Sequence, residues 1–279
     1  HHISHAASAF YPSPYKKSAI LIMDAVGEWA TTSISIGENN KIQILSEINF
    51  PHSIGLLYSA FTYFLGFKVN SGEYKVMGLA PYGQPKYKNI IMKELLDLKE
   101  DGSFRLNMKY FDYATGLTMT NKKFESLFGE KVRNPEKDLL TQFHMDIAAS
   151  IQVVIEEIVL KLAKSLSKES NSKNLCMAGG VALNCVANGK ILKKGYFEDL
   201  WIQPAAGDAG GSLGAALIIY YEHFKKKRII NSKKDSMHNS YLGPTFSNSF
   251  IKQFLDKNKI KYKFKNEINL ASTIANLLS

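Results

Sequence analysis

The sequence is poor in cysteine and has no long apolar run. Cys176 and Cys185 are the only two cysteines among 279 residues. They are too few for the disulfide frameworks of small secreted domains, so a reducing compartment is expected. No apolar stretch approaches the roughly eighteen residues of a membrane span, and the N-terminus shows no secretory signal pattern. We therefore expect a cytoplasmic protein with no membrane partner.

Acidic residues are in the minority, with 25 Asp and Glu against 35 Lys and Arg. The formal net charge is +10, a balance that can indicate nucleic-acid binding. The lysines are nevertheless spread along amphipathic and polar segments. The densest run, residues 225–228, ends an expected helix, where cations favour the helix dipole. We interpret the basic residues as solvated surface and do not expect a nucleic-acid partner.

Internal repeats and low-complexity tracts are also missing. With 45% hydrophobic and 22% charged residues, the chain can form one large or two moderate globular domains. It begins with His1 rather than methionine. We expect it to be a piece of a longer protein, with sequence missing at the front and at the back.

Hydrophobic periodicity predicts an α/β fold. Short apolar or alternating runs predict strands at residues 18–25, 31–36, 41–50, 174–177 and 199–202. Apolar residues at helical spacing predict helices at residues 54–67, 136–168 and 211–224. Residues 99–135 are expected to be irregular, and the polar, basic segment 229–240 is the best linker candidate. Strands that alternate with glycine turns and helices are typical of α/β domains.

Two histidines and two carboxylates are candidate metal ligands. His1 and His5 are four residues apart, which places them on one face of a helix. Asp24 ends a buried strand, and Asp208 lies among small residues before a helix. Such a mixed nitrogen and oxygen site suits Fe(II), Mn or Zn. The alternatives are that Asp208 caps the helix and that the histidines are a tag remnant.

The segment 178–184, AGGVALN, follows a strand and opens a helix. Its paired glycines allow backbone N–H groups to approach phosphate oxygens. Asn184 and Asn188 lie on one face and could contact a nucleotide or substrate. Alternatively, the turn needs small residues only for close packing. The segment matches neither a Walker loop nor a GxGxxG fingerprint.

The segment 72–83, GEYKVMGLAPYG, is rich in turn formers and is expected to be an exposed loop. Lys75 could hold a phosphate or a carbamoyl oxygen. Alternatively, Glu73 and Lys75 form an ion pair on the rim of a site.

Five segments in order resemble the O-carbamoyltransferase family that modifies nodulation factors, cephalosporin precursors and aminoglycosides. They are HHISHAASAFYPSPY (1–15), DAVGEWATTSISIG (24–37), PHSIGLLYSAFTYFLGFKVNSGEYKVMGLAPYG (51–83), CMAGGVALNCVANGKIL (176–192) and QPAAGDAGGSLGAAL (203–217). Each motif is modestly specific, but all five in family order are highly specific.

The resemblance implies an actin/hexokinase-like, ribonuclease H-like fold. Residues 1–228 would be a partial domain without its N-terminal part, and residues 241–279 the truncated start of a C-terminal α/β domain. In the family, the C-terminal domain combines carbamoyl phosphate with ATP and Mg²⁺ into carbamoyl-adenylate. The actin-like domain then moves the carbamoyl group to a hydroxyl of a small metabolite, such as a sugar or natural product. This chain alone is expected to be inactive in the full reaction.

The resemblance also assigns roles to individual residues. The metal ligands, for Fe(II) or a similar ion, would be His1, His5, Asp24 and Asp208. The nucleotide-binding residues would be Gly179, Gly180, Asn184 and Gly207. Lys75 falls within a family element. On chemical grounds, the expected base for the acceptor hydroxyl is an unliganded histidine, such as His2, or a carboxylate. We expect residues 99–135 to contribute to the choice of acceptor.

Three other functions are alternatives. A tRNA threonylcarbamoyl transferase shares the histidine pair and the Asp-Ala-Gly turn, but not the GEWATTS and KVMGLAPYG segments. A sugar kinase or other ATPase of the same fold has no use for the histidine pair. A non-catalytic scaffold would be expected to lose some of the four metal-ligand candidates.

Overall fold

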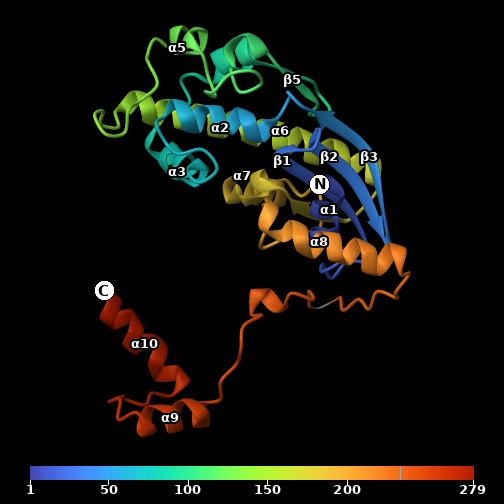
Figure 1. The fold of residues 1–279 in the computed structure, drawn as a ribbon, viewed down its shortest axis with the longest axis vertical. Coiled ribbons are helices and arrows are strands. Elements are labelled where there is room, and N and C mark those ends of the chain that lie inside the picture. Colours follow the sequence, from blue (N-terminus) through green and yellow to red (C-terminus); the bar gives the residue numbers. More distant parts are fainter. Residues whose placement is uncertain (233) are drawn as a thin grey trace. The chain divides into compact units, whose positions relative to one another are not determined.

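The computed structural model describes residues 1–232 and 234–279, except the side chains of Glu267 and Ile268 (Figure 1). The chain divides into two compact units, His1–Ser236 and Met237–Ser279. This division falls inside the segment 229–240, which the sequence predicts as a linker. Lys233, in the same segment, lies outside the described residues.

A mixed five-stranded sheet forms the centre of the first unit, in the order β3-β2-β1-β6-β7. Its strands are β1 (Lys17–Gly27), β2 (Ala30–Glu38), β3 (Lys41–Asn49), β6 (Asn174–Ala178) and β7 (Asp199–Ile202). Strand β2 is antiparallel to β1 and β3, whereas β6 and β7 run parallel to β1. All five predicted strands are present, and the α/β class is confirmed.

Helices cover both faces of this sheet (Figure 1). Leu21 and Met23 of β1 pack with α2 (Ile54–Phe64) and α6 (Gln142–Ser170). Ile20 and Ile22 point to the opposite face, where α1 (His2–Phe10) and α8 (Gly211–Ile218) lie. Successive side chains of a strand alternate between faces, so a strand covered on both sides must be continuously apolar. This explains the uninterrupted apolar run that ends at Asp24.

Helices α1 and α8 approach each other very closely. A Cβ atom on Gly214 of α8 would lie 1.8 Å from the carbonyl oxygen of Ser4 in α1. Only glycine allows this spacing, because any side chain would push the two backbones apart. The contact matters for function because α1 and the turn before α8 both carry candidate metal ligands.

Some helix boundaries differ from the predictions. Helix α6 begins at Gln142, not at residue 136, because Thr141 and His144 form a reciprocal capping box at that point. The helix predicted for 211–224 ends at Ile218 and continues as a π-helical turn, Ile219–His223. The basic run 225–228 is only partly solvated: Arg228 is buried, with 6% of its surface exposed.

Smaller elements complete the first unit. They are α3 (Glu73–Leu79), η1 (Ala80–Tyr82), α4 (Lys88–Ile90), η2 (Ile91–Leu95), β4 (Leu96–Leu98), β5 (Phe104–Leu106), η3 (Met108–Tyr110), α5 (Lys122–Phe128), η4 (Gly180–Leu183), α7 (Cys185–Lys194) and η5 (Asp208–Gly210). Three of these α-helices, namely α3, α4 and α5, lie where no helix was predicted. Helix α3 occupies the segment expected to be a loop, and α5 lies within the region expected to be irregular.

The second unit contains η7 (His238–Ser240), α9 (Asn248–Lys257) and α10 (Glu267–Leu278). No strand occurs among its described residues. Across the described part of the chain, no helix has the length and apolar content needed to cross a bilayer.

Candidate metal centre and adjoining cleft

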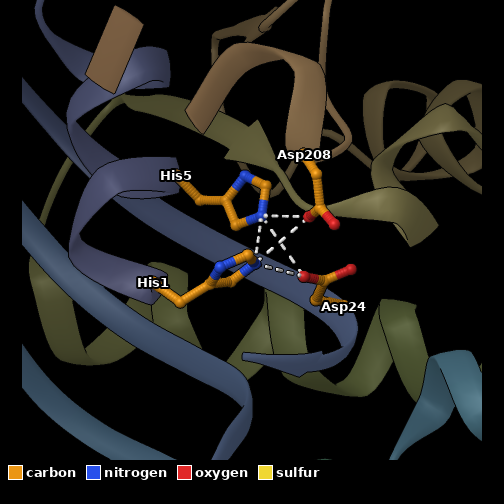
Figure 2. A group of neighbouring side chains, drawn as sticks. All are labelled: His1, His5, Asp24 and Asp208. Atoms are coloured by element: carbon orange, nitrogen blue, oxygen red, sulfur yellow. Dashed lines mark hydrogen bonds and ion pairs between the residues drawn. The ribbon is translucent and has the colours of Figure 1, made fainter. Parts of the chain in front are cut away.

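Three separate segments bring the four predicted metal ligands together (Figure 2). His1 immediately precedes α1 and His5 lies in its first turns, so both rings leave the same helix face. Asp24 belongs to β1, and Asp208 begins the short turn η5 before α8. The predicted cluster is therefore present, although its members are up to 207 positions apart in the sequence.

The ligand atoms of the cluster converge on one point. The Nε2 atoms of His1 and His5 are 3.1 Å apart, and they lie 3.0 and 3.2 Å from Oδ2 of Asp24. Oδ1 of Asp208 lies 3.2 Å from Nε2 of His1 and 3.5 Å from that of His5. Figure 2 shows the four groups pointing toward one another.

These distances fit a shared cation. Nitrogen and oxygen ligands about 2.1 Å from one ion lie about 3.0 to 3.4 Å from each other in octahedral or tetrahedral geometry. His5 is completely buried, and its Nδ1 has no hydrogen-bond partner among the described residues. The other ring nitrogen of His5 faces the cluster. The donor set and its spacing therefore suit a divalent metal.

The local structure keeps Asp24 ionised and oriented. Burial raises the pKa of its carboxyl group, but hydrogen bonds from His5 and from the N–H groups of Ala25 and Gly180 outweigh burial and lower the pKa. The N–H of Gly180 donates to Oδ1 at 3.2 Å, which leaves Oδ2 for the cluster. Asp208 does not cap α8, because Gly210 occupies the N-cap position.

The glycine turn serves the cluster rather than offering free N–H groups to a phosphate. Gly179 donates its N–H to the carbonyl of Ala206 at 2.7 Å, and Gly180 donates to Asp24. Gly179 also has a φ of +89°, and a Cβ there would lie 2.2 Å from the carbonyl oxygen of Met23. Both N–H groups are therefore bonded within the protein, and a phosphate contact through them stays a prediction. Both glycines are needed for close packing and for holding Asp24.

Asn184 is also occupied within the protein. Its Oδ1 accepts from the N–H of Ala187 and so caps α7, and its amide pairs reciprocally with that of Gln152 at 3.0 and 3.1 Å. Gln152 also accepts from the hydroxyl of Tyr58 and donates to Glu156. Sequence reasoning gave no role to Glu156 or Tyr58. The only available signal was the four-residue spacing of Gln152 and Glu156 within an apolar helix stripe.

Gln152→Leu is expected to lower the free energy of unfolding by about 3 kcal/mol, because it leaves the buried side-chain N–H of Asn184 and the hydroxyl of Tyr58 without their acceptor. Tyr58→Phe removes one hydrogen bond and should cost only about 1 kcal/mol. Urea unfolding of both variants measures the difference. Equal losses of stability in the two variants would contradict the conclusion that Gln152 joins Tyr58 and Asn184 in one hydrogen-bond network.

A cleft of about 840 Å³ adjoins the cluster. Asp24 and Asp208 lie on its wall. The predicted nucleotide-binding residues Gly180, Asn184 and Gly207 also line it. Apolar side chains supply much of the remaining surface, namely Val26, Leu56, Val69, Met77, Met119, Ile155, Val181 and Leu183. A largely apolar cavity with a few polar groups is typical of a small-molecule site.

His2 and Lys75 do not line this cleft. His2 is buried, with Nδ1 2.8 Å from the hydroxyl oxygen of Ser33. Burial, despite the nearby Asp24, lowers the pKa of its imidazole to about 4. Lys75 is exposed, and its ammonium lies over the ring of Phe67. Neither predicted catalytic residue therefore lines the cleft, although the ring of His2 lies 6.2 Å from that of His1 and 6.4 Å from that of His5.

The alternative ion pair between Glu73 and Lys75 is not formed among the described residues. The Glu73 carboxylate instead accepts hydrogen bonds from the hydroxyl of Ser59 and the N–H groups of Asn70 and Gly72. It also lies on the wall of the cleft.

Comparisons with known proteins place the chain in a family. Residues 1–217 match the family model described as the carbamoyltransferase N-terminus. The chain is 58% identical over its full length to an uncharacterized protein, sll1178, of Synechocystis sp., of which it covers 45%. It is 39% identical to the nodulation protein NolNO of Sinorhizobium fredii, with 80% of this chain and 31% of the relative aligned. The chain belongs to the carbamoyltransferase family, which is a family of transferase enzymes.

A further relative is the nodulation protein NolO of Bradyrhizobium diazoefficiens, 34% identical over 89% of this chain and 42% of the relative. The chain thus spans less than half the length of these three relatives. The crystal structure of T. kodakarensis HypF aligns with 80% of this chain and 37% of that chain, at 16% identity and a TM-score of 0.36. This likeness is too low to support an argument.

Proposed function

We propose that the intact protein is an ATP-dependent O-carbamoyltransferase that uses carbamoyl phosphate, through carbamoyl-adenylate, to modify a hydroxyl of a small metabolite. The observation that carries the proposal is the cluster of His1, His5, Asp24 and Asp208, of which Asp24 and Asp208 lie on the wall of a cleft. Membership of the carbamoyltransferase family supports carbamoyl transfer as the reaction.

The four clustered side chains would hold Fe(II) or a similar divalent ion. A bound cation of this kind supplies Lewis acidity, which lowers the cost of negative charge on a carbonyl or phosphate oxygen. Gly180 fixes the rotation of the Asp24 carboxylate through one oxygen and leaves the other for the centre. The apolar residues of the cleft wall would limit contact of water with a bound adenylate, whose AMP group is a good leaving group.

The acceptor hydroxyl must lose a proton to a group in the cleft. His2 and Lys75 lie outside it. The carboxylates on the described wall belong to Asp24, Asp208 and Glu73, and the first two are directed at the candidate metal centre. We therefore assign the role of base to Glu73 in place of His2.

The finer fold class is part of the same proposal. We propose that the first unit is part of an actin/hexokinase-like domain that binds the nucleotide with Mg²⁺. Three consecutive antiparallel strands, of which β1 contains Asp24, support this, as do the parallel strands β6 and β7. The second unit would begin the domain that forms carbamoyl-adenylate.

The test uses the intact protein, purified without oxygen and supplied with Fe(II), ATP and carbamoyl phosphate. Mass spectrometry should detect carbamoyl-adenylate and pyrophosphate, and a panel of sugars and natural products should reveal a carbamoylated product. His1→Ala/His5→Ala is expected to form the adenylate normally but to slow transfer at least about 100-fold, because the metal centre is lost. Absence of adenylate in the wild type would refute the proposal.

A further inference from the structure

Arg228 is a buried cation outside the cleft. Its guanidinium donates from Nε to the carbonyl of Tyr11 at 3.0 Å, and from Nη2 to the carbonyls of Phe10 at 2.7 Å and Ser13 at 2.9 Å. Within the described part of the chain, none of its bonds reaches a carboxylate; the others go to the Asn39 carbonyl and the Ser13 hydroxyl. Burying a charge without a carboxylate is costly, so the carbonyl contacts must compensate for it.

Two of these carbonyls lie at the C-terminal end of α1. Phe10 is the last residue of the helix and Tyr11 is its C-cap. The last carbonyls of a helix lack partners within it and carry the negative end of its dipole. Arg228 satisfies them with a positive charge and also stacks 4.3 Å from the centre of the Phe10 ring. It thus fastens one end of α1.

The other end of α1 carries the histidines of the metal centre. His1 is the N-cap and forms no side-chain cap bond, and His5 lies one turn later. The helix has nine residues, which corresponds to a length of about 13 Å. Metal sites tolerate deviations of only about 0.2 Å in ligand distance. A small slide or rotation of α1 would therefore separate His1 and His5 from the two aspartates.

One continuous segment supplies both Asp208 and Arg228. Between them, α8 packs against α1 where Gly214 meets Ser4. Glu222 follows α8 in the chain, and its carboxylate accepts a hydrogen bond from the hydroxyl of Tyr11, the C-cap of α1, at 2.9 Å. The segment 208–228 thus places Asp208 beside the two histidines and also binds the C-terminal end of α1 through Arg228.

We infer that Arg228 is a positioning residue for the metal centre: by capping α1 it fixes His1 and His5 against Asp208. This inference rests on the proposed function, since it concerns the same centre. Arg228 acts through α1 and touches none of the four ligands.

Arg133 offers a matched control. It too is buried, with 9% of its surface exposed, and it donates to the main-chain carbonyls of Leu65 at 2.7 Å and Asp138 at 2.8 Å. Its guanidinium also lies over an aromatic ring, that of Phe67. It has no bond to α1, so its replacement reproduces the loss of a buried arginine without loosening the histidines.

The experiment titrates Co²⁺ into the metal-free intact protein and follows visible absorption for wild type, Arg228→Met, Arg228→Lys and Arg133→Met. Arg228→Met should raise the dissociation constant on the order of 10-fold, as loss of outer-shell support does. Arg228→Lys keeps the positive charge but lacks the several N–H donors of a guanidinium. Its dissociation constant should lie between those of wild type and Arg228→Met. Arg133→Met should stay within about twofold of wild type.

Hydrogen exchange at the amides of α1, measured without metal, provides a second readout. Exchange should be faster in Arg228→Met and unchanged in Arg133→Met. Wild-type affinity in Arg228→Met and Arg228→Lys, or equal weakening by Arg133→Met, would overturn the inference while leaving the proposed function intact. Failure of the wild type itself to bind Co²⁺ would instead contradict the proposed metal centre and, with it, the proposed function.

Discussion

His5→Ala is expected to raise the dissociation constant of the intact protein for Co²⁺ or Fe(II) by at least about 100-fold. His5 is completely buried, and its Nε2 is 3.1 Å from that of His1 and 3.2 Å from Oδ2 of Asp24. Alanine removes one of four ligands from the most enclosed position, and its methyl group offers no donor atom to the metal. Anaerobic metal titration with absorption or calorimetric detection measures the effect.

His144→Ala is the control for this variant. His144 caps α6 by accepting the N–H of Thr141 at 3.0 Å, and it does not line the cleft. Its loss should cost about 1 kcal/mol of stability, as other helix caps do, and leave metal affinity unchanged. A His5→Ala protein that binds metal as tightly as wild type would show that the four side chains form a hydrogen-bonded cluster rather than a metal centre.

Gly214→Ala is expected to lower the free energy of unfolding by about 3 kcal/mol, because the added methyl group must force α8 away from α1. Its Cβ would lie 1.8 Å from the Ser4 carbonyl oxygen. This clash is with the backbone, so only a movement of one helix away from the other can remove it. Helix α1 carries His5, and α8 directly follows the turn that contains Asp208. Metal affinity should therefore fall as well. Urea unfolding and metal titration of one preparation measure both effects.

Gly211→Ala tests the same substitution in the same helix. A Cβ at this position meets no atom within 4 Å. It should therefore be neutral or stabilise the protein by up to about 1 kcal/mol, because alanine favours the helical state. If Gly214→Ala were as stable as Gly211→Ala, the close approach of α1 and α8 would not be a constraint on the fold.

Much of the site was predictable because its signals are local. The apolar run that ends at Asp24 has the pattern of a buried strand, and the spacing of His1 and His5 places both on one helix face. The small residues around Asp208 leave its carboxylate uncovered. These features depend only on side-chain size, hydrophobicity and position along the chain.

The structure differs from the sequence-based expectation at residues whose partners are distant in sequence. Arg228 ends a run of lysines and therefore looked solvated, but its partners begin at Phe10, 218 positions away. The N–H of Gly180 looked free for phosphate, but it is bonded to Asp24. His2 lies beside His1, yet one residue along a helix turns a side chain by about 100°, and the ring points to Ser33 instead.

The sequence by itself therefore determined the five strands of the central sheet, the helices α2, α6 and α8 apart from their exact ends, and the identity of the four candidate metal ligands, because periodicity and residue chemistry are local properties. Only the tertiary structure decided which donors remain free, which charges are buried and which side chains reach the cleft. Those outcomes depend on how β1, α1 and α8 pack together. Close packing and hydrogen-bond satisfaction are set between segments that are far apart along the chain.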